Sequence, residues 1–143
     1  MATKHQGDLL SLLGRPNTVL VICMNSAVRS DGERIMLNGA AGRLAAKMPL
    51  VPKQLGKAMT DKGEFWHFIC PPSAKIGVFQ NEHLPKNGPD LKLISHAAKL
   101  LREVAQANPD KVYALEHPGG KEPDFLFESI YRILPDNVQV WKL

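Results

Sequence analysis

The chain has 143 residues, which is the size of one ordinary domain and too short for two domains with separate cores. Its hydrophobic content of 44% and charged content of 22% are typical of a globular protein and exclude a disordered chain. No apolar run approaches the roughly 18 residues that a membrane helix needs, and the first residues lack the apolar core of a signal peptide. We therefore expect one cytoplasmic, monomeric domain that does not interact with a membrane.

The net charge of +4 is concentrated in the middle of the chain. Residues 1–42 carry 4 basic and 3 acidic side chains, residues 43–80 carry 6 and 2, and residues 81–143 carry 8 and 9. Such a local positive field attracts a phosphate-bearing small molecule as readily as a polynucleotide. Aromatic residues make up only 6% of the chain, so stacking on single strands is poorly supported and nucleic acid ranks last among the partners.

Neither the cysteines nor the histidines are spaced as metal ligands are. Cys23 and Cys70 lie inside apolar runs, which is typical of small buried side chains in a reducing compartment. The histidines, which are also scattered, are His5, His67, His83, His96 and His117. We expect no metal ion and no cofactor.

Strands and helices are predicted to alternate along the chain. A first strand ends before Gly7, and the clearest strand, 18–24, is almost continuously apolar, as a strand covered on both faces requires. Further strands are predicted at 64–70, 75–79, 111–116 and 137–143. Helices are predicted at 38–48, 51–60, 91–107 and 124–134, with Asp90 as the N-cap of the longest.

This alternation predicts a single α/β domain over residues 1–143, a three-layer α/β/α arrangement around a mixed, largely parallel sheet. Ligands of such a sheet bind beyond the carboxyl ends of its strands. Three segments of the chain fall at those ends, and each has a functional and a structural interpretation.

The first segment is Gly7-Asp8-Leu9. The carboxylate of Asp8 is able to accept a hydrogen bond from the exocyclic amine of a base. Aspartate is also a favoured N-cap, so a purely structural role for Asp8 is about as well supported by the spacing.

The second segment is the end of the clearest strand at Asn25, followed by the glycine-containing helix start at 38–42. Backbone N–H groups at a helix start bind anions, and small side chains permit a pyrophosphate to approach closely. Arg43 and Lys47 would add positive charge on one face of that helix. The alternative is that these small residues only allow the helix to pack closely on the sheet.

The third segment is 117–121, after the strand 111–116. Its two glycines are able to direct several N–H groups toward one point, and Lys121 is long enough to reach a phosphate. The alternative is an ordinary turn between a strand and a helix. Two glycine loops at the ends of two strands support a diphosphate site better than either loop alone.

These segments occur in the order found in a known family. The sequence GDLL begins at Gly7, MLNGAAGRLAAKMPLVPKQLGKAM begins at Met36, VFQNEHLPKNGPDLKLI begins at Val78, and LEHPGGKEPDFLFESIYRILPDNVQVW begins at Leu115. Over nearly its whole length the chain resembles a macro domain, the ADP-ribose-binding module, and particularly the small versions found in bacteria and phages.

The resemblance implies roles for individual residues. Asp8, with Leu9 beside it, would bind the adenine amine, and Asn25 would face the distal ribose. The residues that would line the diphosphate and the distal ribose are Leu37, Asn38, Gly39, Ala40 and Ala41. The second diphosphate loop would consist of Pro118, Gly119, Gly120 and Lys121.

The chain departs from the family pattern at three points. Leu37 replaces a glycine that follows the methionine in close relatives, which narrows the approach to the distal ribose. Glu82 stands where the small relatives carry a lysine that attacks the distal ribose carbon. The second loop lacks its usual Gly-Cys-Gly, and Asp124 is shifted relative to the aspartate that often follows that loop.

The sequence therefore leaves three functions open, and whether the protein is an enzyme stays undecided. The first is binding of ADP-ribose or a related nucleotide with hydrolysis of an ester at the distal ribose, as in an ADP-ribose 1''-phosphate phosphatase or an ADP-ribosyl-ester hydrolase, with Asn25 and Asp124 as catalytic candidates. The second is a non-catalytic reader or sponge for such a nucleotide or for an ADP-ribosylated protein. The third is nucleic-acid binding by the positive middle segment.

Overall fold

The computed structural model describes residues 1–26, 36, 39–59, 65–71, 74–84, 88–120 and 122–143. Six strands form one sheet in the order β1-β6-β5-β2-β4-β3. Their bounds are Thr3–Gln6 (β1), Thr18–Met24 (β2), Phe68–Ile69 (β3), Ile76–Gln80 (β4), Val112–Glu116 (β5) and Val138–Lys142 (β6). Only β3 runs antiparallel to its neighbour, so the sheet is mixed and largely parallel, as the sequence predicts.

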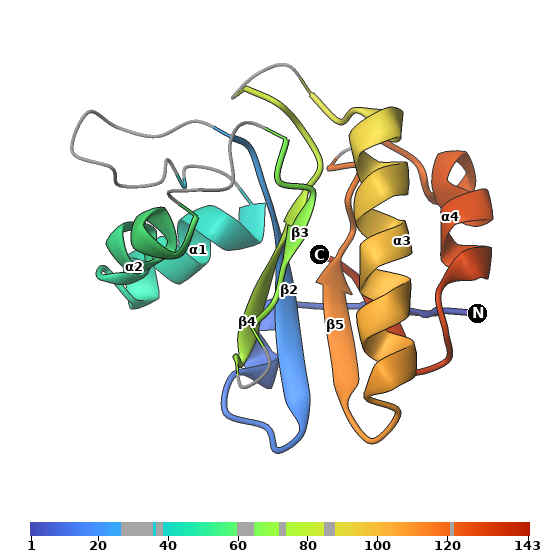
Figure 1. Cartoon of the computed structure of the whole chain (residues 1–143), viewed down its shortest axis with the longest axis horizontal. Coiled ribbons are helices and arrows are strands. Elements are labelled where there is room, and N and C mark those ends of the chain that lie inside the picture. Colours follow the sequence, from blue (N-terminus) through green and yellow to red (C-terminus); the bar gives the residue numbers. More distant parts are fainter. Residues whose placement is uncertain (27–35, 37–38, 60–64, 72–73, 85–87, 121) are drawn as a thin grey trace.

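Helices cover both faces of the sheet (Figure 1). The helices α1 (Gly39–Lys47) and α2 (Val51–Ala58) lie on one face, and α3 (Leu91–Ala107) and α4 (Glu128–Ile133) lie on the other. Two short 3-10 helices complete the described elements, η1 (Leu9–Leu12) and η2 (Asp124–Phe127). The predicted three-layer α/β/α architecture is confirmed.

Strand β2 supplies side chains to both cores because successive residues of a strand point to opposite faces. Val19, Val21 and Cys23 belong to the core beneath α3 and α4. The alternate residues Leu20 and Ile22 belong to the core beneath α1 and α2. A nearly continuous apolar run is therefore the sequence that this central strand requires.

Helix α3 has the bounds that the sequence predicts. Its N-cap is Asp90, whose carboxylate accepts hydrogen bonds from the N–H groups of Lys92 at 2.9 Å and Leu93 at 3.3 Å. These bonds satisfy donors of the first turn that have no partner within the helix.

No helix among the described residues is long and apolar enough to cross a membrane.

Two predicted elements differ from the observed ones. The strand predicted at 64–70 is reduced to Phe68–Ile69, because His67 has a φ of 55° and so cannot continue an extended strand. The side chain of Gln80 accepts from the His67 N–H at 3.0 Å. The helix predicted at 124–134 begins as the 3-10 helix η2 before α4.

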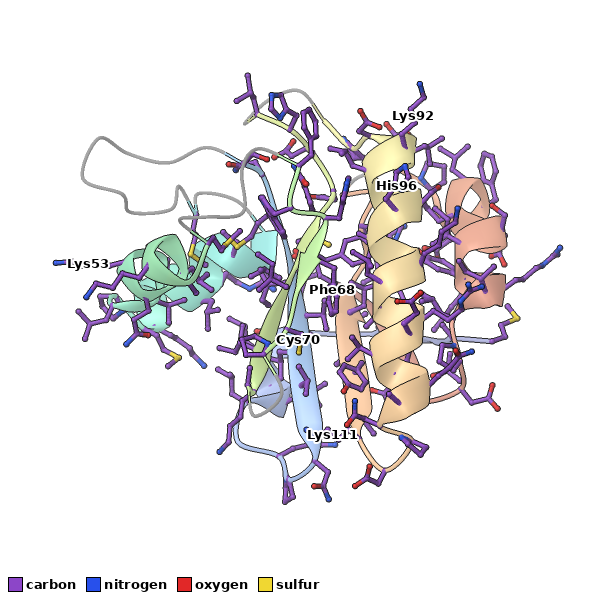
Figure 2. All side chains as sticks on the ribbon, in the orientation of Figure 1. Lys53, Phe68, Cys70, Lys92, His96 and Lys111 are labelled. Atoms are coloured by element: carbon purple, nitrogen blue, oxygen red, sulfur yellow. The ribbon has the colours of Figure 1, made fainter. Side chains whose placement is uncertain are left out.

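Much of the positive charge of the middle segment lies on the outer surface. Lys53 projects from α2 away from the sheet (Figure 2), and Lys47 and Lys57 are also exposed. Arg43 is half-buried and lines a pocket at the start of α1. Only part of the basic surplus is therefore close to a place where a small ligand could bind.

Candidate functional site

A pocket of about 860 Å³ lies at the carboxyl edge of the parallel strands. Four parts of the chain line it, namely the turn after β1, the first turns of α1, the end of β5 with its following turn, and the end of β6. The lining residues are Gly7, Leu9, Gly39, Ala40, Arg43, Glu116, His117, Gly120, Trp141, Lys142 and Leu143. The volume is within the range of ordinary small-molecule sites.

The fold brings four of the predicted ligand-binding residues together in this pocket. They are Leu9, Gly39, Ala40 and Gly120. The other predicted residues that the structure describes do not line it, namely Asp8, Asn25, Ala41, Pro118, Gly119 and Asp124. Leu37, Asn38 and Lys121 lie outside the described residues.

Asp8 has a structural role that the sequence analysis left open. Its carboxylate accepts from the Leu10 N–H at 3.0 Å and thereby caps η1. The same oxygen, Oδ1, lies 3.2 Å from the Arg43 guanidinium, and the Asp8 side chain is 48% exposed. The carboxylate therefore fixes the turn beside the pocket and keeps half of its surface available.

Leu9 and Trp141 give the pocket an apolar wall. Leu9 is almost fully buried, and Trp141 packs partly against the same core. The Trp141 ring stacks on His5 with the ring centroids 5.0 Å apart, and its indole N–H donates to the side chain of Gln139 at 3.0 Å. These contacts fix the orientation of a large flat surface beside Gly7.

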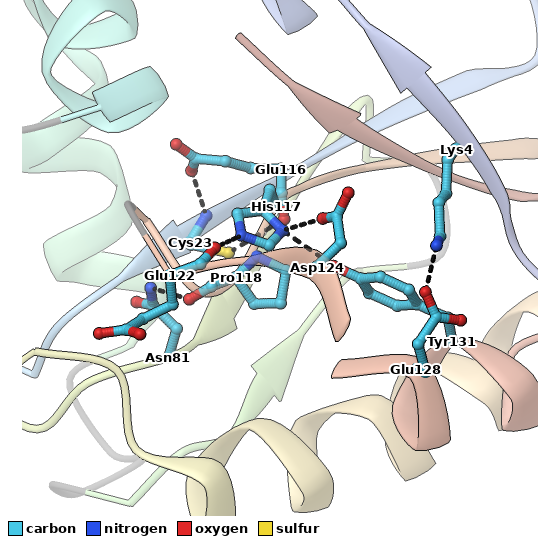
Figure 3. A network of polar contacts seen from close by, with 10 residues as sticks. All are labelled: Lys4, Cys23, Asn81, Glu116, His117, Pro118, Glu122, Asp124, Glu128 and Tyr131. Carbon is cyan, nitrogen blue, oxygen red and sulfur yellow. Dashed lines mark hydrogen bonds and ion pairs between the residues drawn. The ribbon is translucent and has the colours of Figure 1, made fainter. Parts of the chain in front are cut away.

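Glu116, the last residue of β5, is the carboxylate side chain that lines the pocket among the described residues. Its Oε1 accepts from the Cys23 N–H at 3.0 Å, and its Oε2 accepts from the Ala40 N–H at 2.9 Å (Figure 3 shows the first contact). Burial raises the pKa of the Glu116 carboxyl, while these two N–H groups and the charge of Arg43 oppose that rise. The carboxylate joins the ends of β2 and β5 to the start of α1.

His117 lies beside Glu116 and anchors the turn after β5 (Figure 3). Its Nε2 lies 2.9 Å from the carbonyl of Glu122, which only accepts, so Nε2 is the donor. A neutral His117 then accepts at Nδ1 from the Tyr131 hydroxyl at 2.8 Å. Burial, with the nearby carboxylate of Asp124, raises the pKa of Tyr131.

Asp124, a predicted catalytic residue, contacts this network from a partly exposed position, with 39% of its side chain exposed. Its Oδ1 lies 3.2 Å from Nδ1 of His117, which is 3% exposed. Asp124 therefore faces the histidine that holds the turn in place.

The turn that contains the two glycines is packed against the protein itself. A Cβ at Gly119 would lie 2.2 Å from Cε2 of Phe127, which is buried. The carbonyl of Pro118 accepts from the Asn81 side chain at 2.8 Å, and this bond ties the turn to the end of β4. Gly120 has a φ of 57° and lines the pocket.

Asn25 directly follows β2, at the same edge of the sheet. Next to it, the Ser26 N–H donates to the carbonyl of His83 at 2.8 Å, and the Gln80 side chain donates to the Ser26 hydroxyl. The Asn81 N–H donates to the carbonyl of Met24 at 3.3 Å. The ends of β2 and β4 are thus held together around Asn25.

The sequence did not predict Glu116, Trp141, Lys142 and Leu143 as parts of the pocket. A carboxylate that ends an apolar strand was the available signal for Glu116, since charged groups at that edge face the ligand side of the sheet. Nothing near Trp141 in the sequence indicates that β6 lies beside β1.

Among the described residues, no group of three or more His, Cys, Asp or Glu side chains is arranged to hold a metal ion.

Comparison with solved structures identifies the architecture. The macrodomain of Thermus aquaticus DarG matches with a TM-score of 0.68 and 18% identity, over 99% of this chain and 96% of that one. The macrodomain of Mycobacterium tuberculosis DarG matches with a TM-score of 0.68 and 18% identity, over 100% and 98%. This chain has the macrodomain fold.

A third solved structure that matches is Thermosipho africanus DarTG in complex with ADP-ribose. Its TM-score is 0.69 at 18% identity, and the match covers 99% of this chain and 42% of that one. No protein-family model matches the sequence, and no curated protein matches it significantly. The macrodomain fold of this chain is therefore evident in its structure and not in overall sequence identity.

Proposed function

We propose that this protein binds ADP-ribose or a closely related nucleotide in the pocket at the carboxyl edge of the sheet. The observation that carries the proposal is the convergence of Leu9, the start of α1 and Gly120 on one cavity of about 860 Å³. Thermosipho africanus DarTG, which this chain matches over 42% of that protein's length, was solved in complex with ADP-ribose. The two observations are independent and support the same ligand.

The parts of the pocket suit different parts of a nucleotide. The apolar wall of Leu9 and Trp141 is matched to a flat base, and the half-exposed carboxylate of Asp8 would accept from its exocyclic amine. Arg43 and Lys142 supply positive charge for a diphosphate. We assign the distal ribose to the end of β2 beside Asn25.

Titration calorimetry with ADP-ribose and with AMP tests this proposal. Asp8→Ser keeps an oxygen that caps η1 and removes the carboxylate, so ADP-ribose should bind about tenfold more weakly, as expected for the loss of one charge-assisted hydrogen bond. Asp110→Ser is the matched control, because Asp110 is exposed and precedes β5 at the opposite edge of the sheet. Equal and weak affinity of the unmodified protein for ADP-ribose and AMP would contradict the proposal.

Of the two ADP-ribose functions, we favour a reader or sponge over a hydrolase. Two carboxylates near the ends of the strands, Asp124 and Glu82, do not line the pocket. Asp124 faces His117 at 3.2 Å, and Glu82 accepts from the Gly88 N–H at 3.1 Å. We therefore expect no steady release of phosphate from ADP-ribose 1''-phosphate or of ADP-ribose from modified protein. Turnover that disappears in Asn25→Ala would favour the hydrolase.

A further inference from the structure

The Glu116 carboxylate occupies two backbone N–H donors at the carboxyl edge of the sheet. The backbone pairing of β2 with β5 ends at Val21 and Leu115. Beyond that pair, the Cys23 N–H donates to the Glu116 carboxylate at 3.0 Å. The side chain thus replaces a backbone acceptor and turns toward the start of α1.

The second oxygen of the same carboxylate lies at the start of α1. Oε2 accepts from the N–H of Ala40, the second residue of the helix, at 2.9 Å. A helix start carries a partial positive charge and unpaired N–H donors, which is why anions bind there. Here the anion is supplied by residue 116 of the same chain.

Gly39 is the residue that makes this contact possible. A Cβ at position 39 would lie 2.7 Å from Oε2 of Glu116, closer than real Cβ contacts come. Gly39 also has a φ of 58°, a backbone conformation that favours glycine. The sequence predicts close approach of a pyrophosphate at this glycine, but the Glu116 carboxylate takes the space that the missing side chain leaves.

We propose that Glu116 is an internal occupant of the anion-binding start of α1, and that a ligand phosphate must displace it to reach the Ala40 N–H. The inference rests on the proposed nucleotide function of the same pocket, which Glu116, Gly39 and Ala40 line. A phosphate placed beside the carboxylate would be repelled, because like charges within a few ångströms interact strongly in a partly buried site. Glu116 thereby selects against ligands whose phosphate points at α1.

Glu116→Gln tests this inference by binding measurements with two probes, ADP-ribose and adenosine. An amide has one acceptor oxygen, so it leaves at least one of the two N–H groups for a phosphate and removes the negative charge. ADP-ribose should bind about tenfold more tightly to Glu116→Gln, which corresponds to about 1.4 kcal/mol. Adenosine, which has no phosphate, should bind equally to both proteins.

Glu103→Gln is the matched control because it removes the same charge from an exposed position on α3, across the sheet from α1. It should bind both probes as the unmodified protein does. ADP-ribose affinity that is unchanged or weaker in folded Glu116→Gln overturns the inference and leaves the proposed function standing. A failure of both proteins to bind ADP-ribose overturns the proposed function itself.

A measurement on the unmodified protein covers the case in which Glu116→Gln does not fold. If ADP-ribose displaces the carboxylate, Glu116 loses its hydrogen bonds to the N–H groups of Cys23 and Ala40 when ADP-ribose saturates the protein. The ¹³C resonance of the Glu116 carboxyl carbon, followed at fixed pH during the titration, reports that loss directly. A carboxyl resonance that stays in place at saturation would overturn the inference.

Other ionisable groups surround the site, so the signal must come from Glu116 itself. Cys23 on β2 and Arg43 on α1 act on the Glu116 carboxyl, and His117 after β5 and Lys142 on β6 share the pocket with it. A signal read at the Glu116 carboxyl carbon at one fixed pH separates displacement of this carboxylate from effects at those groups.

Discussion

The two glycine loops at the carboxyl edge of the sheet use their glycines in different ways. At the start of α1, the missing side chain of Gly39 admits the Glu116 carboxylate into the pocket. After β5, the missing side chain of Gly119 admits the ring of Phe127 into the core. In both loops the space is filled by the protein's own side chain, so a glycine near a pocket is not by itself evidence of room for a ligand.

The largest effect is expected at Gly119, where the neighbour is a buried ring. In Gly119→Ala the new methyl group would meet the ring of Phe127, which is 2% exposed and packs against the rings of His117 and Tyr131. We expect a loss of about 3 kcal/mol in the free energy of unfolding, measured by chemical denaturation. In a Phe127→Leu background the same substitution should cost clearly less, and an equal cost in both backgrounds would show that the ring is not the obstacle.

Gly39→Ala should have the next largest effect, because a left-handed backbone and a contact with Glu116 act together. We expect a loss of about 2 kcal/mol in the free energy of unfolding. The part due to the contact should vanish in a Glu116→Ala background, where only the backbone cost remains. A double-mutant cycle measures this difference, and strict additivity of the two substitutions would argue against the contact.

Gly120→Ala separates backbone conformation from crowding. Gly120 has a φ of 57°, and a Cβ there would meet nothing within 4 Å. The cost should therefore be about 1 kcal/mol, from the left-handed conformation alone. Thermal unfolding of Gly120→Ala and Gly120→Asn checks this, since asparagine tolerates the conformation better and should cost less.

The smallest expected effect is the pH dependence that Glu116 gives to stability. Its pKa is raised above the ordinary value of 4.5, so the native state holds this proton more tightly than the unfolded state. The stabilisation is fully present below pH 4.5 and is lost as pH rises through the folded pKa. The melting temperature of the unmodified protein, relative to Glu116→Gln, should therefore fall over that range, and a constant difference would contradict the raised pKa.

Local patterns made much of the fold predictable. The apolar run of β2, the periodicity of α3 and its Asp90 cap depend on residues within a few positions of one another, and the structure has them as expected. The placement of a pocket at the carboxyl edge also followed from the alternation of strands and helices. The short extent of β3 could not be predicted from the strand-like composition of 64–70. His67 has a left-handed backbone conformation, which ends the strand, and its N–H donates to the side chain of Gln80.

The sequence by itself determined the order of the elements, the layer architecture and the loops at the ligand edge, since each is encoded by short-range periodicity, capping and turn residues. Only the tertiary structure decided what fills those loops. Glu116 and Ala40 are 76 positions apart, and their hydrogen bond exists because the sheet brings the end of β5 beside α1. Whether side chains of distant segments contact each other depends on strand register and helix packing, and a local sequence pattern does not encode either.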